Sequence, residues 1–245
     1  MRFFMVVYLE KFIWWYSLQD IKKLEHKDPQ FLALQNCRKK VCSSHKKNEN
    51  LFLFLVVQCA IVSYQIAWTG ETWWTEAWSK FLDDWDYLLN LWNNNEQNGD
   101  WRLDFLKTSK NNKRIYNIKK SRIDKLNQNT EKITWSEYWN QLLKLNELLA
   151  KTLNCKLSSK TIVFAIKMYG YAYTIISWHD VSYPMKINIP IDSRLKKIYN
   201  TCMNLDISTE NEVMNYFGNL SQKYCIPPLD LDTLLWLEYR KILKK

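Results

Sequence analysis

Residues that form turns are unusually scarce in this chain. Its 245 residues include only 4 glycines and 5 prolines, whereas sheets joined by tight turns normally need more of both. Several long stretches also repeat apolar side chains at the spacing of one helix face. Together these features predict an all-α fold. Because 47% of the residues are hydrophobic, the chain can bury a full core, as one compact unit or as two closely packed lobes.

Helical periodicity and start signals give the approximate order of the elements. We expect helices over residues 2–24, about 50–68 and 135–154. Between the first two, Asp28 followed by Pro29 is typical of a helix start, with the aspartate as N-cap and the proline in the first turn.

The apolar stretch 51–68 is long enough to span a bilayer. It contains Gln58, Ser63 and Gln65, which are costly in hydrocarbon, so a buried helix is favoured over a membrane span. The largely apolar residues 1–9 are followed at once by charged residues without a small-residue cleavage site. We therefore expect an intracellular, cytoplasmic protein.

The formal net charge of +10 favours a polyanionic partner, since lysines that neutralise phosphates gain affinity by releasing counterions. A membrane surface would serve equally on charge alone. The segment 107–125 is rich in Lys, Arg and Asn. It is equally consistent with a solvated surface and with a patch that follows nucleic-acid phosphates.

Tryptophans gather between residues 73 and 101, and several are spaced by four or seven positions. This spacing is typical of a helix face and predicts core packing, with stacking on nucleobases as the alternative. The set is Trp73, Trp74, Trp78, Trp85, Trp92 and Trp101.

The 6 cysteines and 3 histidines show no C-x-x-C motif and no tight cluster. We therefore expect buried thiols, no metal and no cofactor.

Residues 156–194 place one lysine and one aspartate at the starts of successive expected helices. Lys160 opens an apolar helix after a short break, and Asp192 opens the next one. The positive end of a helix dipole disfavours a protonated amine, which is one way to make a lysine nucleophilic. The alternatives are a solvent-facing lysine and a simple N-cap. Two helices joined by a few residues also have the outline of a helix-hairpin-helix unit, without its usual Gly-x-Gly.

Five blocks of the chain resemble the archaeal 8-oxoguanine DNA glycosylase/AP lyase family, a divergent branch of the helix-hairpin-helix glycosylase superfamily. They are LEHKDPQ (24–30), VSYQIAWTGETWW (62–74), SSKTIVFAIKMYGYAY (158–173), IPIDSRL (189–195) and IPPLDLDTLLWL (226–237). The resemblance covers about a quarter of the chain but recurs in order along nearly all of it.

The resemblance implies one glycosylase unit over 1–245 with two packed helical lobes and the active site in the cleft between them. It implies a helix-hairpin-helix region at about 141–205, with residues of about 1–140 and 206–245 forming the second lobe and the pocket walls. Lys160 matches the family's Schiff-base lysine and Asp192 its catalytic aspartate. Further matches to pocket positions are Gln30, Ser63, Trp74, Phe164, Lys167, Pro190, Asp232 and Trp236.

By the same resemblance, Phe164 and Trp236 sandwich an extruded base and Asp232 accepts hydrogen bonds from its N–H edge. Each residue also has a purely structural interpretation. These are a capped turn for Gln30, core packing for Trp74 and Phe164, a surface charge for Lys167 and an N-cap for Asp232.

The expected function is excision of 8-oxoguanine through a lysine Schiff base, followed by strand cleavage 3′ to the abasic site by β-elimination. The expected partner is 8-oxoguanine-containing DNA, double-stranded, with single-stranded DNA left open, and the expected state is a monomer. The alternatives are a non-catalytic basic helical module that binds nucleic acid, and a helical scaffold for protein partners.

Overall fold

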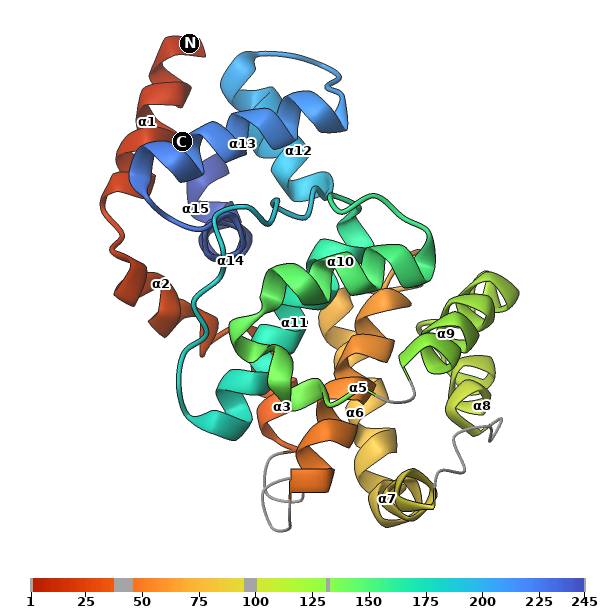
Figure 1. Cartoon of the computed structure of the whole chain (residues 1–245). Helices are drawn as coiled ribbons and strands as arrows, with labels where there is room; N and C mark the ends of the chain where they lie inside the picture. The colour runs from red at the N-terminus through yellow and green to blue at the C-terminus, as the bar shows by residue number, and fades with distance from the viewer. Residues whose placement is uncertain (1, 38–45, 95–100, 131–132, 245) are drawn as a thin grey trace.

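The computed structural model describes residues 2–37, 46–94, 101–130 and 133–244, and within these ranges the chain forms helices joined by turns and loops, without a strand. The all-α prediction is confirmed (Figure 1). The helices are α1 (Arg2–Trp14), α2 (Leu18–Glu25), α3 (Pro29–Gln35), α5 (Lys46–Ile61), α6 (Gly70–Asp83), α7 (Trp85–Asn93), α8 (Trp101–Thr108), α9 (Tyr116–Thr130), the 3₁₀ helix η1 (Trp135–Asn140), α10 (Leu142–Leu153), α11 (Lys160–Ser177), α12 (Ser193–Met203), α13 (Glu210–Tyr224), α14 (Pro228–Leu237) and α15 (Tyr239–Leu243).

The helices bury two separate hydrophobic cores. The larger core draws on α3, α5 to α11 and η1, and the smaller one on α1, α2 and α12 to α15. Figure 1 shows the two groups as lobes, with both chain ends in the smaller one. The helices α11 and α12, which begin at Lys160 and beside Asp192, therefore belong to different lobes.

Two packed helices form the centre of the larger lobe. The helix α11 packs along α5 and also contacts α3 and α10. Every residue from Leu51 to Val62 is buried, which agrees with a buried helix at this position. None of the helices in the described ranges has the length and apolar character needed to cross a membrane.

Three expected helices are divided or shortened in the structure. The expected helix 2–24 is two helices, because Ser17 and Asp20 form a capping box that starts α2 afresh. The expected helix 135–154 is likewise divided between η1 and α10. The helix expected to reach residue 68 ends at Ile61, and the segment that follows includes Gln65 in a left-handed backbone conformation, with φ of 48°.

The tryptophan-rich region mainly builds the larger core. Trp73, Trp74, Trp78 and Trp85 are buried on α6 and at the start of α7. The prediction of core packing is confirmed for these four side chains, and Trp74 in addition faces a cavity described below.

Gly170, in the middle of α11, allows the ring of Tyr183 to approach the helix. A Cβ atom at residue 170 would lie 2.6 Å from Cε1 of Tyr183, whose hydroxyl donates to the Lys167 carbonyl at 3.0 Å. Alanine in a helix normally stabilises by up to about 1 kcal/mol relative to glycine. Here we expect Gly170→Ala to lower the free energy of unfolding by about 1–3 kcal/mol through overpacking.

The matched control for this prediction is Gly218→Ala in α13, where an added Cβ meets nothing within 4 Å. That variant should be as stable as the wild type or more stable. Denaturant unfolding of both variants checks the expectation, and a stabilised Gly170→Ala protein would contradict it.

Candidate functional site

One cavity of about 240 Å³ is lined by elements of both lobes. The larger lobe contributes α3, α6, α11 and the segment after α5, and the smaller lobe contributes α14 and the residues leading into α12. All ten residues named from the sequence line it. They are Gln30, Ser63, Trp74, Lys160, Phe164, Lys167, Pro190, Asp192, Asp232 and Trp236.

Lys160 is the first residue of α11, as expected, and its side chain is exposed. Its amine forms no ion pair or hydrogen bond with any residue in the described ranges. The side chain lines the cavity. An amine at this position can therefore reach a molecule in the cavity without first breaking a contact within the protein.

Asp192 is the N-cap of α12 and also lines the cavity. Its Oδ1 accepts a hydrogen bond from the Leu195 N–H at 2.9 Å. This bond fixes the orientation of the carboxylate at the start of α12. Asp192 thus caps a helix and faces the cavity at once, so the structural interpretation does not exclude a functional one.

Lys167 and Asp232 form a buried ion pair in the lining of the cavity. Their Nζ and Oδ2 atoms are 2.6 Å apart, and the residues are only 2% and 6% exposed. Burial disfavours the charge on Lys167, but the Asp232 and Asp28 carboxylates outweigh it and raise the pKa of Lys167 above its usual value. The second lysine of the cavity is therefore held as an ammonium ion.

These positions correct two of the structural interpretations. Lys167 is not a surface charge, because it is buried and paired. Asp232 is not the N-cap of the last long helix, because α14 begins at Pro228 with Pro227 before it. Asp232 lies instead in the second turn of α14, where its side chain reaches the cavity.

Three aromatic side chains give the cavity its apolar walls. Trp74 is buried and meets Phe164 edge to face, with ring centroids 6.3 Å apart. Phe164 lies one turn beyond Lys160 on α11, so the two share a helix face. Trp236 lies one turn beyond Asp232 on α14 and is partly exposed. Aromatic walls together with a few charged side chains suit a planar ligand with polar edges.

Gln30 reaches the cavity from the first turn of α3. Its backbone N–H donates to the N-cap Asp28 at 2.8 Å, which confirms the predicted cap and leaves the side-chain amide to face the cavity. The amide lies against Gly70, where an added Cβ would be 3.0 Å from Gln30 Nε2. Gly70 therefore makes room for the amide.

Four cavity residues escaped the sequence reasoning: Tyr64, Gln65, Ile66 and Gly70. The first three lie in the segment that was expected to be helical, and in the structure they follow the end of α5 at Ile61. One signal was present, since Gly70 is one of only 4 glycines in the chain and an isolated glycine often marks a close approach.

The basic segment 107–125 holds the end of α5 in place. Asn112 is buried and donates to the Val62 carbonyl at 3.2 Å. The Arg122 guanidinium donates to the Ile61 carbonyl at 3.4 Å and to the Thr161 hydroxyl at 3.3 Å, and it stacks on the Tyr64 ring. A cation at a helix C-terminus is favourable. Part of this segment therefore shapes the cavity wall next to Lys160.

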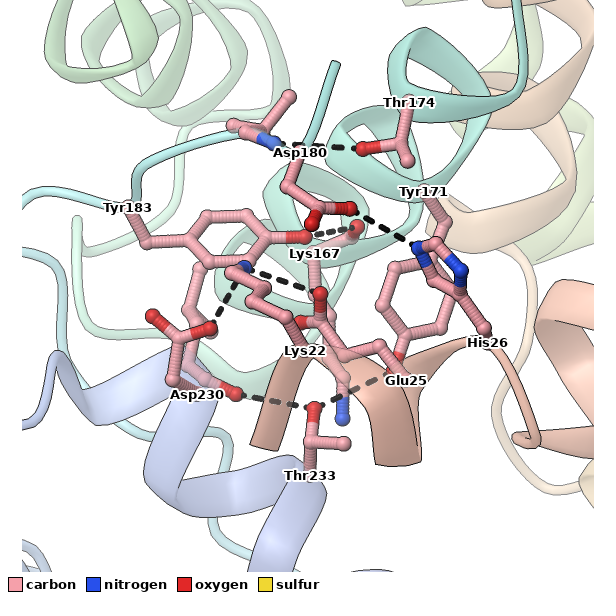
Figure 2. A network of polar contacts seen from close by, with 12 residues as sticks. Lys22, Glu25, His26, Lys167, Tyr171, Thr174, Asp180, Tyr183, Asp230 and Thr233 are labelled. Carbon is pink, nitrogen blue, oxygen red and sulfur yellow. Dashed lines mark hydrogen bonds and ion pairs between the residues drawn. The ribbon is translucent and has the colours of Figure 1, made fainter. Parts of the chain in front are cut away.

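A network of buried polar and charged side chains joins the two lobes (Figure 2). Lys22 of α2 binds Glu25 at 2.9 Å and Asp230 of α14 at 2.6 Å, and its ammonium lies 4.5 Å from the centre of the Tyr183 ring. Tyr171 donates to Asp28 at 3.0 Å. Counting the pair of Lys167 and Asp232, the network has more carboxyl groups than ammonium groups, so it balances its charge only by retaining protons.

Glu25→Gln should weaken the pH dependence of unfolding. Burial raises the pKa of Glu25 from 4.5 to about 8, against the effect of the Lys22 ammonium. The folded state therefore binds a proton more strongly than the unfolded state. This contribution to stability is complete below pH 4.5 and is lost as the pH rises through about 8.

The melting temperature of the wild type should fall more steeply across that pH window than that of Glu25→Gln, whose amide mimics the protonated acid. Glu147→Gln, which removes an exposed carboxylate from α10, should keep the wild-type slope. Equal slopes for wild type and Glu25→Gln would show that Glu25 does not retain the proton.

Within the described ranges, no three His, Cys, Asp or Glu side chains come together as a metal site. The polar groups of the cavity are those of lysine, carboxylate, amide and hydroxyl side chains. Such groups can carry out nucleophilic and proton-transfer chemistry.

Comparison with known proteins finds relatives that are named N-glycosylase/DNA lyase. The family model described as AGOG, N-glycosylase/DNA lyase, matches residues 11–245. A protein of Methanococcus maripaludis named N-glycosylase/DNA lyase is 37% identical over 225 residues, which are 90% of this chain and 82% of that protein. A protein of the same name from Nanoarchaeum equitans is 33% identical over 233 residues, which are 92% and 87% of the two chains.

A solved structure shares the fold. It is the crystal structure of an 8-oxoguanine DNA glycosylase from Pyrobaculum aerophilum complexed with 8-oxoguanosine. The TM-score is 0.75 at 24% sequence identity, and the match covers 96% of this chain and 88% of that chain.

Proposed function

Because the chain belongs to the AGOG family of N-glycosylase/DNA lyases, we propose that it excises 8-oxoguanine from DNA and then cleaves the strand 3′ to the abasic site. The observation that carries the proposal is the contrast between the two lysines of the cavity. Lys160 has an unpaired amine beside the cavity, whereas Lys167 is locked in an ion pair. One amine is free to react and the other is not.

Lys160 is the proposed nucleophile. Its neutral amine attacks C1′ of the damaged nucleoside, so that a bond from Nζ to C1′ forms while the bond from C1′ to the base breaks, and the base leaves with the electron pair and takes up a proton. Opening of the sugar gives an imine, which acidifies the 2′ hydrogen. Loss of that proton then expels the 3′ phosphate by β-elimination. The same lysine links base removal to strand cleavage.

Asp192 is the proposed electrostatic partner. Positive charge grows on the sugar as the base departs, and a fixed carboxylate nearby stabilises that transition state more than the ground state. The hydrogen bond from Leu195 holds the carboxylate in place before the reaction begins. This pre-organisation supports the role, because no reorientation of the carboxylate is needed during the reaction.

The remaining cavity residues form the proposed base pocket. The target base must leave the duplex stack, since its glycosidic carbon is inaccessible there. Phe164 and Trp236 would then stack on its two faces, and Asp232 would accept hydrogen bonds from its N–H edge while Lys167 neutralises that carboxylate. Trp74, Ser63 and Pro190 complete the walls.

Discrimination between 8-oxoguanine and guanine requires a hydrogen-bond acceptor that faces N7, because only the oxidised base carries a proton there. The side-chain oxygen of Gln30 is the proposed acceptor on the cavity surface, with a backbone carbonyl as the alternative. N7 of unmodified guanine carries no proton and is itself an acceptor. In such a pocket it would face the acceptor of the protein, and no hydrogen bond could form between them.

Trp236→Ala should weaken binding to damaged DNA more than binding to undamaged duplex. Stacking on an aromatic side chain contributes about 1–3 kcal/mol per base, and an undamaged duplex that keeps its bases stacked does not use it. Competition binding at one salt concentration measures both affinities. Trp68→Ala, which removes an exposed tryptophan outside the cavity lining, is the control, and equal losses on the two DNAs would make Trp236 merely structural.

A single assay tests the proposed function. A duplex with one 8-oxoguanine is incubated with the protein, and cleavage is followed on a gel with borohydride trapping in parallel. We expect cleavage at the lesion together with a covalent protein–DNA adduct. Binding without cleavage would support the basic nucleic-acid module, and the absence of both would support a protein scaffold.

The proposal also fixes the expected partner and organisation. The proposed enzyme acts inside the cell as a monomer, without a cofactor, on double-stranded DNA, with single-stranded DNA left open as a substrate. Residues 141–205 act as the helix-hairpin-helix unit, with α10 and α11 in the larger lobe and α12 in the smaller. The formal charge of +10 supports the DNA assignment.

A further inference from the structure

Arg194 stacks on the indole ring of Trp236. It is the second residue of α12, two positions after Asp192, and its guanidinium carbon lies 3.4 Å from the centre of the ring. At this distance the planar guanidinium covers the indole face in a cation–π contact. The ring proposed to stack on the base therefore has a charged side chain behind it.

The contact lies outside the base cavity. Trp236 lines both that cavity and a neighbouring hollow of about 410 Å³, whereas Arg194 lines only the hollow. Glu71, Tyr239 and Arg240 line the same hollow. Arg194 thus meets Trp236 outside the cavity that Lys160 and Phe164 line.

An ion pair between the lobes holds the guanidinium in this position. Nη2 of Arg194 lies 3.8 Å from Oε1 of Glu71, and both side chains are partly buried. Glu71 is in the first turn of α6, next to the cavity residue Gly70. The helix α6 belongs to the larger lobe, and α12 and α14 belong to the smaller. Through Arg194, the Trp236 ring in the smaller lobe is therefore connected to Glu71 in the larger lobe.

We propose that Arg194 is a positioning residue that holds Trp236 in the orientation needed to stack on the extruded base, with Glu71 as its anchor. This inference rests on the proposed function, because it assigns Trp236 to the base pocket. Arg194 touches neither the base nor the sugar. Arg194 therefore affects only the steps in which the base is bound. It does not affect strand cleavage at a site that has already lost its base.

The test compares two substrates under single-turnover conditions with saturating enzyme. One duplex carries a single 8-oxoguanine and the other carries a preformed abasic site at the same position. We expect Arg194→Ala to slow base excision by roughly ten-fold, the size of one cation–π contact. Strand cleavage at the preformed abasic site should stay within about two-fold of the wild type, since one rim charge contributes little once the enzyme is saturated.

Two further variants separate stacking from charge. Arg194→Lys keeps the charge but lacks the planar group, so it should lose most of the excision rate as well; it also answers the question if Arg194→Ala does not fold. Arg240→Ala is the matched control, since Arg240 lines the same hollow, is exposed and forms no ion pair within the described ranges. Loss of this exposed charge should change both reactions by the same factor.

Equal losses on both substrates for Arg194→Ala, or full rescue by Arg194→Lys, would overturn the inference. A failure of the proposed function has a different signature, because the wild type itself would then neither cleave the abasic duplex nor be trapped on it. In that case the inference is tested by binding alone, through the ratio of the affinities for damaged and undamaged duplex, measured for the wild type and for Arg194→Ala. Arg194→Ala should lower this ratio several-fold, and an unchanged ratio would contradict it.

Discussion

Lys160→Gln should abolish borohydride trapping on 8-oxoguanine DNA and strand cleavage at the lesion, while binding to DNA persists. The reason is chemical, since an amide cannot form the imine that both steps require. The side chain is exposed and makes no contact that folding would lose, so the melting temperature should change little. We expect a loss of several orders of magnitude, down to the background of the gel assay.

Two lysines serve as controls for that experiment. Lys156→Gln removes an exposed charge four residues earlier in the chain and outside the cavity lining, and it should retain trapping. Lys167→Gln breaks the buried ion pair with Asp232 and should reduce stability, because removing one partner leaves an uncompensated buried charge. A covalent adduct of wild-type yield with Lys160→Gln would refute the assignment of the nucleophile.

Asp192→Asn should slow base excision by about a hundred-fold or more while the fold is retained. Asparagine caps helices about as well as aspartate, so the hydrogen bond from the Leu195 N–H should survive. What is lost is the negative charge that stabilises the developing cation on the sugar. Single-turnover excision rates measure the effect, and thermal unfolding verifies that α12 still forms.

The control for the loss of charge is Asp206→Asn. Asp206 is an exposed residue of the segment that follows α12 in the same lobe and does not line the base cavity. That variant should excise at nearly the wild-type rate. If Asp192→Asn excised as fast as this control, Asp192 would be an N-cap and no more.

Local features of the fold could be predicted from the sequence where a single residue type determines the local conformation. The cap formed by Asp28 and Pro29, the start of α11 at Lys160 and the cap at Asp192 all lie as predicted. Each depends on a few neighbouring residues, because N-capping is a contact within one helix turn. The all-helical class followed in the same way from the scarcity of turn residues.

The features that escaped prediction depend on contacts between distant residues. The helix α5 ends at Ile61 because Asn112 and Arg122, more than 45 positions later, satisfy the carbonyls at its end. The buried pairing of Lys167 with Asp232 joins residues 65 positions apart. Periodicity and local propensity carry no information on such contacts, and tertiary packing overrides them.

The residues of the candidate site were identified by the resemblance to the glycosylase family. The structure adds the partners and the burial of each side chain. Nothing in the sequence showed that Lys167 would be neutralised by Asp232 while Lys160 stays unpaired, although this difference decides which amine can react. The buried network of Lys22, Glu25 and Asp230 was also unexpected. Its members lie on two helices from opposite ends of the chain, and each residue alone is typical of a solvated surface.

The most direct test of the central claim is to locate the attachment site of the sugar after borohydride reduction. The wild-type protein is trapped on an 8-oxoguanine duplex and digested, and the modified peptide is sequenced by mass spectrometry. The account predicts that the reduced deoxyribose is attached to Nζ of Lys160. Attachment to Lys167, to another lysine or to the N-terminal amine would contradict it.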